Sequence, residues 1–354
     1  MFHALVTPKR PASSHEEGVD KSETGARRAW RKAYRSVGFN KGYNLPLFII
    51  FAGAMFGFCL SRLQYLDVAG NFASNTAPSE WYWFRTGHYR IGLTLHLATA
   101  LPAGLLMVWQ FVPYIRHRHL LFHRLNGYLV VMLLVLSNVG ALMIARRAFG
   151  GDISTQAAVG VLALTTSGGL AMALYNVKRL QIDQHRVWML RTIVWAGSII
   201  TVRILLKIAP AVTSRVGSYY AVASCSEITF EYGSVETAAL FYPQCAADVV
   251  RNWTVNGMVA VWAKDTGMPE NISASLGINF GMTVWMSLFL HMVGVEVYLA
   301  LTPAESERLK VVSYEKQLEA GLENPGNAGL TAERWGDATA WAPPRTVAAG
   351  GQLF

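Results

Sequence analysis

The sequence predicts an all-α fold, a polytopic bundle of about six transmembrane helices with a long loop between the fifth and the sixth. Two observations predict it. Of 354 residues, 52% are hydrophobic and only 15% are charged, whereas a soluble domain carries about 25% charged residues. The apolar residues also form runs of about 20, which as helices cross roughly 30 Å of hydrocarbon. These two features exclude a soluble enzyme.

Hydropathy divides the chain into a membrane domain, residues 45–302, and two tails. The predicted spans are about 45–63, 89–112, 127–146, 156–176, 188–209 and 280–301. Residues 1–44 form a basic N-terminal tail, and residues 211–278 form the long loop. Residues 303–354, rich in Gly, Pro and Ala, are expected to be a flexible C-terminal tail.

The distribution of Lys and Arg predicts the orientation of the spans. These residues gather in the N-terminal tail and in the connections after spans 2 and 4, and are sparse after spans 1 and 5. Because cytosolic loops carry the excess of positive charge, both termini are expected in the cytosol. The net charge of +9 then faces anionic lipid. The expected partner is the lipid bilayer of the secretory pathway or plasma membrane, and not nucleic acid.

The long loop points to the same orientation. It holds Cys225 and Cys245, together with two N-x-S/T sequons at Asn252 and Asn271. Disulfides and N-glycans both form on the extracytosolic side of secretory membranes. We therefore predict a Cys225–Cys245 disulfide and a glycoprotein, with Asn252 the favoured glycan site because Asn271 lies close to the predicted sixth span.

Four histidines fall into two layers. His96 in span 2 and His291 in span 6 lie at comparable depths towards the outer side, whereas His123 and His185 precede spans 3 and 5 on the cytosolic side. Ionisable groups within a bilayer are costly and mark functional sites. Two layers of paired imidazoles are what two haem groups in a helix bundle need. Haem b is thus the candidate cofactor; packing by hydrogen-bonded histidines is the alternative.

Two arginines add to this pattern. Arg191 shares a face of span 5 with His185, and Arg203 lies near the depth of His96. A cation at that depth needs an anionic partner, and the only acid in the predicted spans, Glu296, lies nearer the cytosolic side. A bound group with carboxylates or phosphates, haem propionates among them, would neutralise these arginines. The alternative for Arg203 is a side chain that extends to the outer interface.

Three short stretches resemble a known family: L-H-L around His96, H-R-L-N-G-Y from His123 and H-R-V-W-M-L-R from His185. The H-R-x-x-G and H-R-x-W-M-x-R patterns resemble those of predicted multi-pass membrane proteins that carry only a domain-of-unknown-function label, fungal members in particular. The resemblance covers about 115 residues and implies topology and candidate residues, but no reaction. The layered histidines are similar only in arrangement to the cytochrome b561 superfamily.

Three functions fit these observations. The first is a haem-binding transmembrane redox protein. The second is a membrane-embedded biosynthetic enzyme of specialised metabolism, which acts on a lipophilic substrate through His96, His291 and Arg203 as an acid/base pocket. The third is a non-catalytic scaffold or small transporter. The solitary Glu296 argues against terpene cyclisation, because carbocation chemistry usually uses paired carboxylates.

Overall fold

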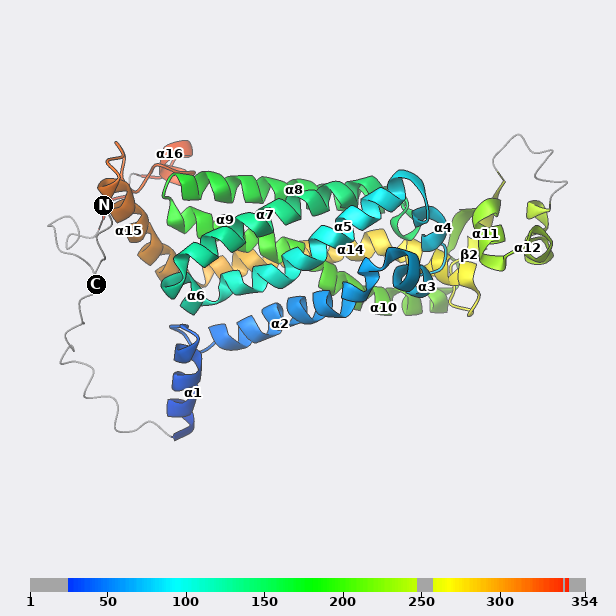
Figure 1. Ribbon diagram of the computed structural model, residues 1–354, viewed down its shortest axis with the longest axis horizontal. Coiled ribbons are helices and arrows are strands. Elements are labelled where there is room, and N and C mark those ends of the chain that lie inside the picture. The colour runs from blue at the N-terminus through cyan, green and yellow to red at the C-terminus, as the bar shows by residue number, and fades with distance from the viewer. Residues whose placement is uncertain (1–24, 247–256, 340, 344–354) are drawn as a thin grey trace.

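The computed structural model describes residues 25–246, 257–339 and 341–343, and shows an elongated bundle of helices (Figure 1). Within these ranges six helical segments are long and apolar enough to cross a membrane: 44–66, 87–111, 120–144, 153–178, 182–216 and 269–300. The predicted all-α bundle with six spans is confirmed.

The helices of the bundle are longer than hydropathy predicted. The third span begins at residue 120 rather than 127, and the sixth at 269 rather than 280, so His123 and the last residues of the predicted long loop belong to helices. The fifth span consists of two helices that meet at Gly197. The elements are α2 (Asn44–Arg62) with η2 (Leu63–Leu66), α5 (Gly87–Met107) with η4 (Val108–Phe111), α7 (Leu120–Ile144), α8 (Ile153–Lys178), α9 (Ile182–Ala196), α10 (Ser198–Val216) and α14 (Pro269–Ala300).

The shorter elements gather at the two ends of the bundle, which we call the tail end and the loop end (Figure 1). The tail end carries α1 (Gly25–Ser36), α6 (Pro113–Arg118), α15 (Pro303–Glu319) and α16 (Ala332–Trp335). The loop end carries η3 (Val68–Phe72), α3 (Ala73–Asn75), α4 (Glu80–Phe84), η5 (Ala148–Gly150), β1 (Tyr220–Ser224), α11 (Cys225–Tyr232), α12 (Val235–Phe241), η6 (Pro243–Cys245) and β2 (Met258–Trp262).

The outer surface of the long helices is apolar. Leu121, Leu164 and Phe289 are 70%, 75% and 66% exposed, and many other large apolar side chains of these helices are also exposed. A soluble monomer rarely exposes apolar patches of this extent. Hydrocarbon is the environment that suits such a surface, and the protein is therefore embedded in a bilayer.

Glycines let α5 and α7 approach until their backbones touch. A Cβ atom added at Gly140 of α7 would lie 2.6 Å from the amide nitrogen of His96 and 2.8 Å from the carbonyl oxygen of Gly92. One added at Gly92 would lie 2.7 Å from Cβ of Met143. Small residues are the usual means of close helix contact in membranes, where dispersion forces replace the hydrophobic effect. This contact fixes His96 against α7.

The long loop is a small folded unit with its own core. Strands β1 and β2 pair antiparallel, with Tyr220 opposite Trp262. Cys225 and Cys245 form the predicted disulfide, and both pack with Ile228, Val261 and neighbouring apolar residues that include the first turns of α14. The disulfide thereby joins α11 to the segment after α12.

Of the two predicted glycosylation sites, the structure describes one. Asn252 lies outside the described residues. Asn271 lies in the first turn of α14, where it is buried and its Nδ2 atom donates a hydrogen bond to Oγ1 of Thr266 at 2.8 Å. A glycan needs an accessible amide nitrogen, so the expected modification of Asn271 does not fit the folded structure.

The C-terminal segment differs from the flexible tail that its composition predicted. Helix α15 is followed by a segment that folds back on the α8–α9 turn through two fully buried glutamines, Gln181 and Gln317. Nε2 of Gln317 donates to Oε1 of Gln181 at 2.9 Å, and the amides of Gly326 and Gly329 donate to these side chains. The composition predicted a flexible tail because it is polar, but polar side chains can be buried and stabilise a fold when each has its hydrogen-bond partners.

Replacing Gly140 by alanine should lower the unfolding temperature of the detergent-solubilised protein. Alanine is the better helix former by about 1 kcal/mol, but its Cβ atom would collide with the backbone of His96. Gly160 of α8 is the matched control, since a Cβ there meets nothing within 4 Å, and Gly160→Ala should leave the temperature unchanged or raise it. Equal effects of the two substitutions would contradict the α5–α7 contact.

Candidate functional site

Two ionisable side chains lie near each other at the loop end of the bundle, Glu80 of α4 and Arg203 of α10. Glu80 is only 7% exposed, and its Oε1 atom accepts a hydrogen bond from the amide of Phe149 at 2.7 Å. The guanidinium carbon of Arg203 lies 5.3 Å from the centre of the Phe149 ring, and its positive charge acts on Glu80. We call Glu80, Phe149, Arg203 and His96 the loop-end cluster.

A strained turn between α7 and α8 creates the contact with Glu80. Phe149 has a left-handed backbone with φ of 48°, and Gly150 and Gly151 follow with φ of 79° and 60°. Such a conformation costs a residue with a side chain about 1–3 kcal/mol and is concentrated at functional sites. Stacking of the Phe149 ring on Phe280, with 4.4 Å between centroids, holds the turn in place, so that its free amide meets the Glu80 carboxyl.

The environment of Glu80 keeps its carboxyl protonated. Burial raises the pKa of Glu80 from 4.5 to about 8, while the Phe149 amide and the charge of Arg203 act in the opposite direction. Desolvation dominates because a carboxylate loses more hydration energy than these two partners return. At neutral pH, Glu80 is therefore mainly a carboxylic acid that has a proton to give.

Two further carboxyls surround this site. Oε1 of Glu231 accepts a hydrogen bond from the amide of Ser79 at 2.7 Å. Burial raises the pKa of Glu231 and of Glu227, both on α11. Arg147, whose guanidinium lies 3.5 Å from the Trp83 ring centre, opposes the rise at Glu227. The loop after span 5 thus brings its acids against the loop after span 1.

These acids were not predicted from the sequence, because the functional residues were expected within the spans. Glu80, Glu227 and Glu231 all lie in loops, and their proximity depends on how two distant loops pack. One signal was present in the sequence: Glu80 directly precedes the aromatic run W-Y-W-F, which is suited to bury it.

His96 has the position that the sequence predicted, in the same layer as Arg203. Its Nδ1 atom lies 3.0 Å from the carbonyl oxygen and 3.1 Å from Oγ of Ser137 in α7. The charge of Arg203 reaches the ring, so the two residues are near neighbours. The contacts to Ser137 orient the ring through Nδ1, so that Nε2 is the nitrogen that could donate or accept a proton.

His291 does not fit the predicted role of a haem ligand. Its Nε2 lies 2.8 Å from Oγ1 of Thr201, and its Nδ1 lies 2.7 Å from the carbonyl oxygen of Val194. In an unbroken helix that carbonyl would pair with the amide of residue 198, which is where α10 begins. Because an iron ligand needs one nitrogen without another partner, His291 acts as a brace between α14 and the interrupted fifth span.

The predicted residues at the tail end differ in their hydrogen-bond partners, although the charge of His185 reaches the ring of His123. Nδ1 of His185 lies 2.9 Å from the Ala173 carbonyl oxygen, whereas Nδ1 of His123 is buried and has no hydrogen-bond partner among the described residues. Arg191 donates to both carboxylate oxygens of Glu296, at 2.7 and 2.9 Å. The anion expected for Arg191 is thus supplied by the protein, and not by a ligand.

A cofactor of two haem groups therefore does not fit the predicted ligand set. In the outer pair, His96 and His291, both ring nitrogens of His291 already have partners. The charge of Arg191 is already neutralised by Glu296 and does not require a propionate. Among the described residues no group of three or more His, Cys, Asp or Glu side chains is placed to hold a metal ion.

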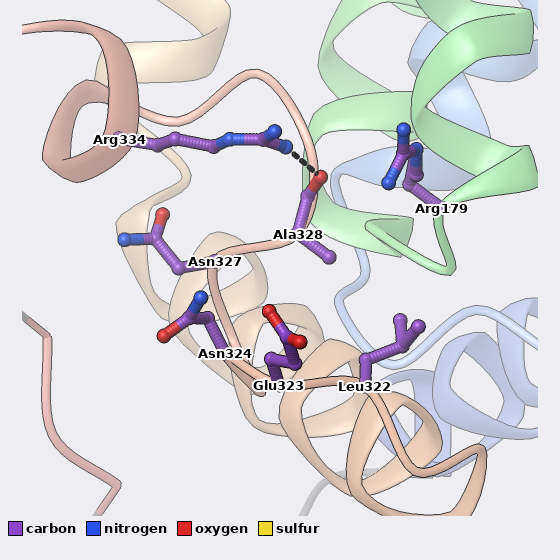
Figure 2. A pocket seen from close by; sticks show the side chains of 7 residues that line it. All are labelled: Arg179, Leu322, Glu323, Asn324, Asn327, Ala328 and Arg334. Carbon is purple, nitrogen blue, oxygen red and sulfur yellow. Dashed lines mark hydrogen bonds between the residues drawn. The ribbon is translucent and has the colours of Figure 1, made fainter.

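A separate pocket of about 380 Å³ lies at the tail end, between the α8–α9 turn and the C-terminal segment (Figure 2). None of the histidines or arginines that the sequence singled out for a site lines it. The Arg334 guanidinium faces the segment across the pocket and donates to the Ala328 carbonyl oxygen. The lining residues are Arg179, Leu322, Glu323, Asn324, Asn327, Ala328 and Arg334.

The apolar bundle, its six spans and its polar ends define a multi-pass membrane protein. Residues 93–231 match the family model described as predicted membrane protein (DUF2306), which confirms the resemblance indicated by the H-R motifs. The chain is also 25% identical over 327 residues to Ava biosynthesis cluster protein G of Aspergillus versicolor, a match that covers 78% of this chain and 94% of that protein. No solved structure matches the chain.

Stability should fall as pH rises through the titration of Glu80. Its pKa is higher in the folded protein than in the unfolded chain, so its stabilising contribution is complete below about pH 4.5 and is lost by about pH 8. At 1.36 kcal/mol per pKa unit the contribution is at most about 5 kcal/mol. Glu80→Gln, a neutral mimic of the acid, should flatten the dependence of unfolding temperature on pH across this window.

The slope that remains in the Glu80→Gln variant sums the other titrating groups, among which Glu227 and Glu231 have pKa values shifted in the same direction as that of Glu80. Thermal unfolding of both proteins in one detergent, at matched pH values, provides the comparison. Parallel curves for the two proteins would show that Glu80 titrates as an ordinary exposed carboxyl.

Proposed function

We propose that this protein is a membrane-embedded biosynthetic enzyme that moves a proton on a lipophilic substrate at the loop-end cluster, as in an isomerisation or cyclisation. The observation that carries the proposal is Glu80. It is a buried carboxyl, protonated at neutral pH, and lies beside the cation Arg203. Groups with strongly shifted pKa values and a specific charged neighbour are typical of catalytic sites.

The proposed chemistry follows from the groups present. Glu80 donates its proton to the substrate as a general acid. The carboxylate that results keeps the hydrogen bond from the Phe149 amide and the positive field of Arg203. It then accepts a proton from another position of the substrate. The proton count balances, and the step needs no oxidant, reductant or second reactant.

Arg203 and His96 have supporting roles in this proposal. Arg203 stabilises the negative charge that develops on the Glu80 carboxyl as its proton leaves, because an oriented cation is most effective away from water. Nε2 of His96, on a ring oriented by Ser137, provides a second donor or acceptor within the same layer. The bundle supplies the apolar surroundings that a lipophilic substrate requires.

The relative supports a biosynthetic role through its name, which assigns it to a biosynthesis cluster. The disulfide supports an orientation in which the loop end faces the secretory lumen or the cell exterior and the tail end faces the cytosol, since disulfides persist in oxidising compartments. Substrate would then meet Glu80 near the extracytosolic surface of the membrane.

The proposal differs from the haem hypothesis in one measurable property. It predicts no Soret absorption band in the protein purified from cells supplied with haem. A Soret band that disappears in His123→Ala and His185→Ala variants would contradict the proposal and favour electron transfer instead.

The direct test replaces the natural gene in the source organism with the Glu80→Gln form. Loss of the proton donor should lower formation of one lipid-soluble product by at least about a hundredfold, the usual contribution of a general acid, while its precursor accumulates. Mass spectrometry of organic extracts measures both compounds.

The matched control is Glu236→Gln, because Glu236 lies on the exposed face of α12 and undergoes the same chemical change. The control should leave the metabolite profile unchanged, with both proteins present in membranes at equal amounts. Identical profiles for Glu80→Gln, the control and the natural form would overturn the proposal.

A further inference from the structure

A group of basic side chains at the tail end, opposite the loop-end cluster, has more positive charge than the described residues neutralise. Arg116 of α6, Arg186 of α9 and Arg308 of α15 act on one another electrostatically, with Glu305 of α15 among them. Thr302 lies at the start of α15, and its Oγ1 atom accepts a long hydrogen bond of 3.5 Å from Nη2 of Arg186. We call these five residues the tail-end cluster.

In the part of the chain that the structure describes, one arginine of the cluster has a carboxylate bonded to it. Arg308 donates to both oxygens of Glu305, at 2.9 and 2.8 Å. Within the described part of the chain, no ion pair involves Arg116 or Arg186. Among the residues that the structure describes, three guanidinium groups thus face one carboxylate, and two positive charges remain uncompensated.

The clearest sign of a missing partner is Arg186 itself. Its Nη1 atom is buried and has no hydrogen-bond partner among the described residues. Leaving a buried charged donor unpaired costs more than leaving a neutral one. The neighbouring cations add to that cost, since burial together with the charges of Arg308 and Arg186 lowers the pKa of Arg116, and Glu305 opposes them only in part.

The surroundings of the cluster indicate where an anion would come from. The amide of Tyr114 in α6 donates to the carbonyl oxygen of Val37 at 3.2 Å, which joins α6 to the end of α1. Helix α1 contains no buried residue and runs across the long axis of the bundle (Figure 1). It carries Trp30 and Tyr34 four residues apart among five basic residues, a composition typical of helices that lie in the plane of lipid headgroups.

We infer that the tail-end cluster is a binding site for a phosphate group, and that an anionic lipid of the adjacent leaflet supplies it. A phosphate matches the planar fork of two guanidinium groups and accepts several hydrogen bonds at once. It would satisfy Nη1 of Arg186 and balance the two uncompensated charges. This site is independent of the proposed enzyme function and lies at the other end of the bundle.

Native mass spectrometry of the intact detergent-solubilised protein tests this inference, with phosphatidic acid as the probe and phosphatidylcholine as the neutral-headgroup comparison. The natural protein should retain phosphatidic acid, and Arg186→Gln and Arg116→Gln should each weaken retention by about tenfold or more. Arg118→Gln is the matched control, because Arg118 is an exposed residue on the same helix as Arg116. It should retain the lipid like the natural protein.

The stability of Arg186→Gln separates a ligand site from a structural role. If Arg186 is held ready for an anion, its removal should not lower the unfolding temperature in lipid-free detergent, and phosphatidic acid should stabilise the natural protein but not the variant. A lower temperature without lipid, with the same lipid-induced rise in both proteins, would overturn the inference.

Competition with inorganic phosphate distinguishes the two sources of the anion. Weak competition supports the lipid. If inorganic phosphate displaces phosphatidic acid at a concentration similar to that of the lipid, and if Arg186→Gln loses binding of both, the phosphate site is supported but its ligand is a soluble anion. Equal retention of phosphatidic acid by Arg118→Gln, Arg116→Gln and Arg186→Gln would show that general positive charge attracts the lipid, and would overturn the site.

Discussion

A charge that lies beside hydrocarbon must be paired, neutralised or supplied with a ligand, and this constraint governs how both ends of the bundle are built. Arg191 illustrates the first solution, since Glu296 on the neighbouring α14 meets it with two hydrogen bonds. Glu80 illustrates the second, because burial keeps its carboxyl protonated. Arg186 represents the third, since its buried Nη1 atom has no hydrogen-bond partner among the described residues.

The same constraint separates the roles of the two ends. At the loop end, a strained turn at Phe149 gives its amide to the Glu80 carboxyl. Helix α11 of the disulfide-linked loop contacts the preceding residue, Ser79, through Glu231. At the tail end, basic helices lie beside the lipid headgroups that we propose they bind. The interior between them is held by packing and by histidines that brace helices, as His291 does between α14 and the fifth span.

The features predicted from sequence are those that local composition determines. Six spans follow from hydropathy, the disulfide from two cysteines in one loop, and the common layer of His96 and Arg203 from helical rise. The roles of His291 and Arg191 were not predictable in this way, because their partners lie on other helices. Val194 and Thr201 contact the ring nitrogens of His291, and Glu296 accepts the hydrogen bonds of Arg191. Glu80 was not predicted because two loops distant in sequence create its environment. The folded C-terminal segment was not predicted because a segment with buried glutamines has the same composition as a solvated tail.

Infrared spectroscopy of the carboxyl groups measures the protonation of Glu80 most directly. In the reconstituted protein at about pH 7, below the pKa of about 8, the account predicts a component of the protonated-carboxyl C=O band that disappears by about pH 10 and is lost in Glu80→Gln. Spectra of the natural protein and of Glu80→Gln that are identical at neutral pH would contradict it, because Glu80 would then be an ionised carboxylate with no proton to donate.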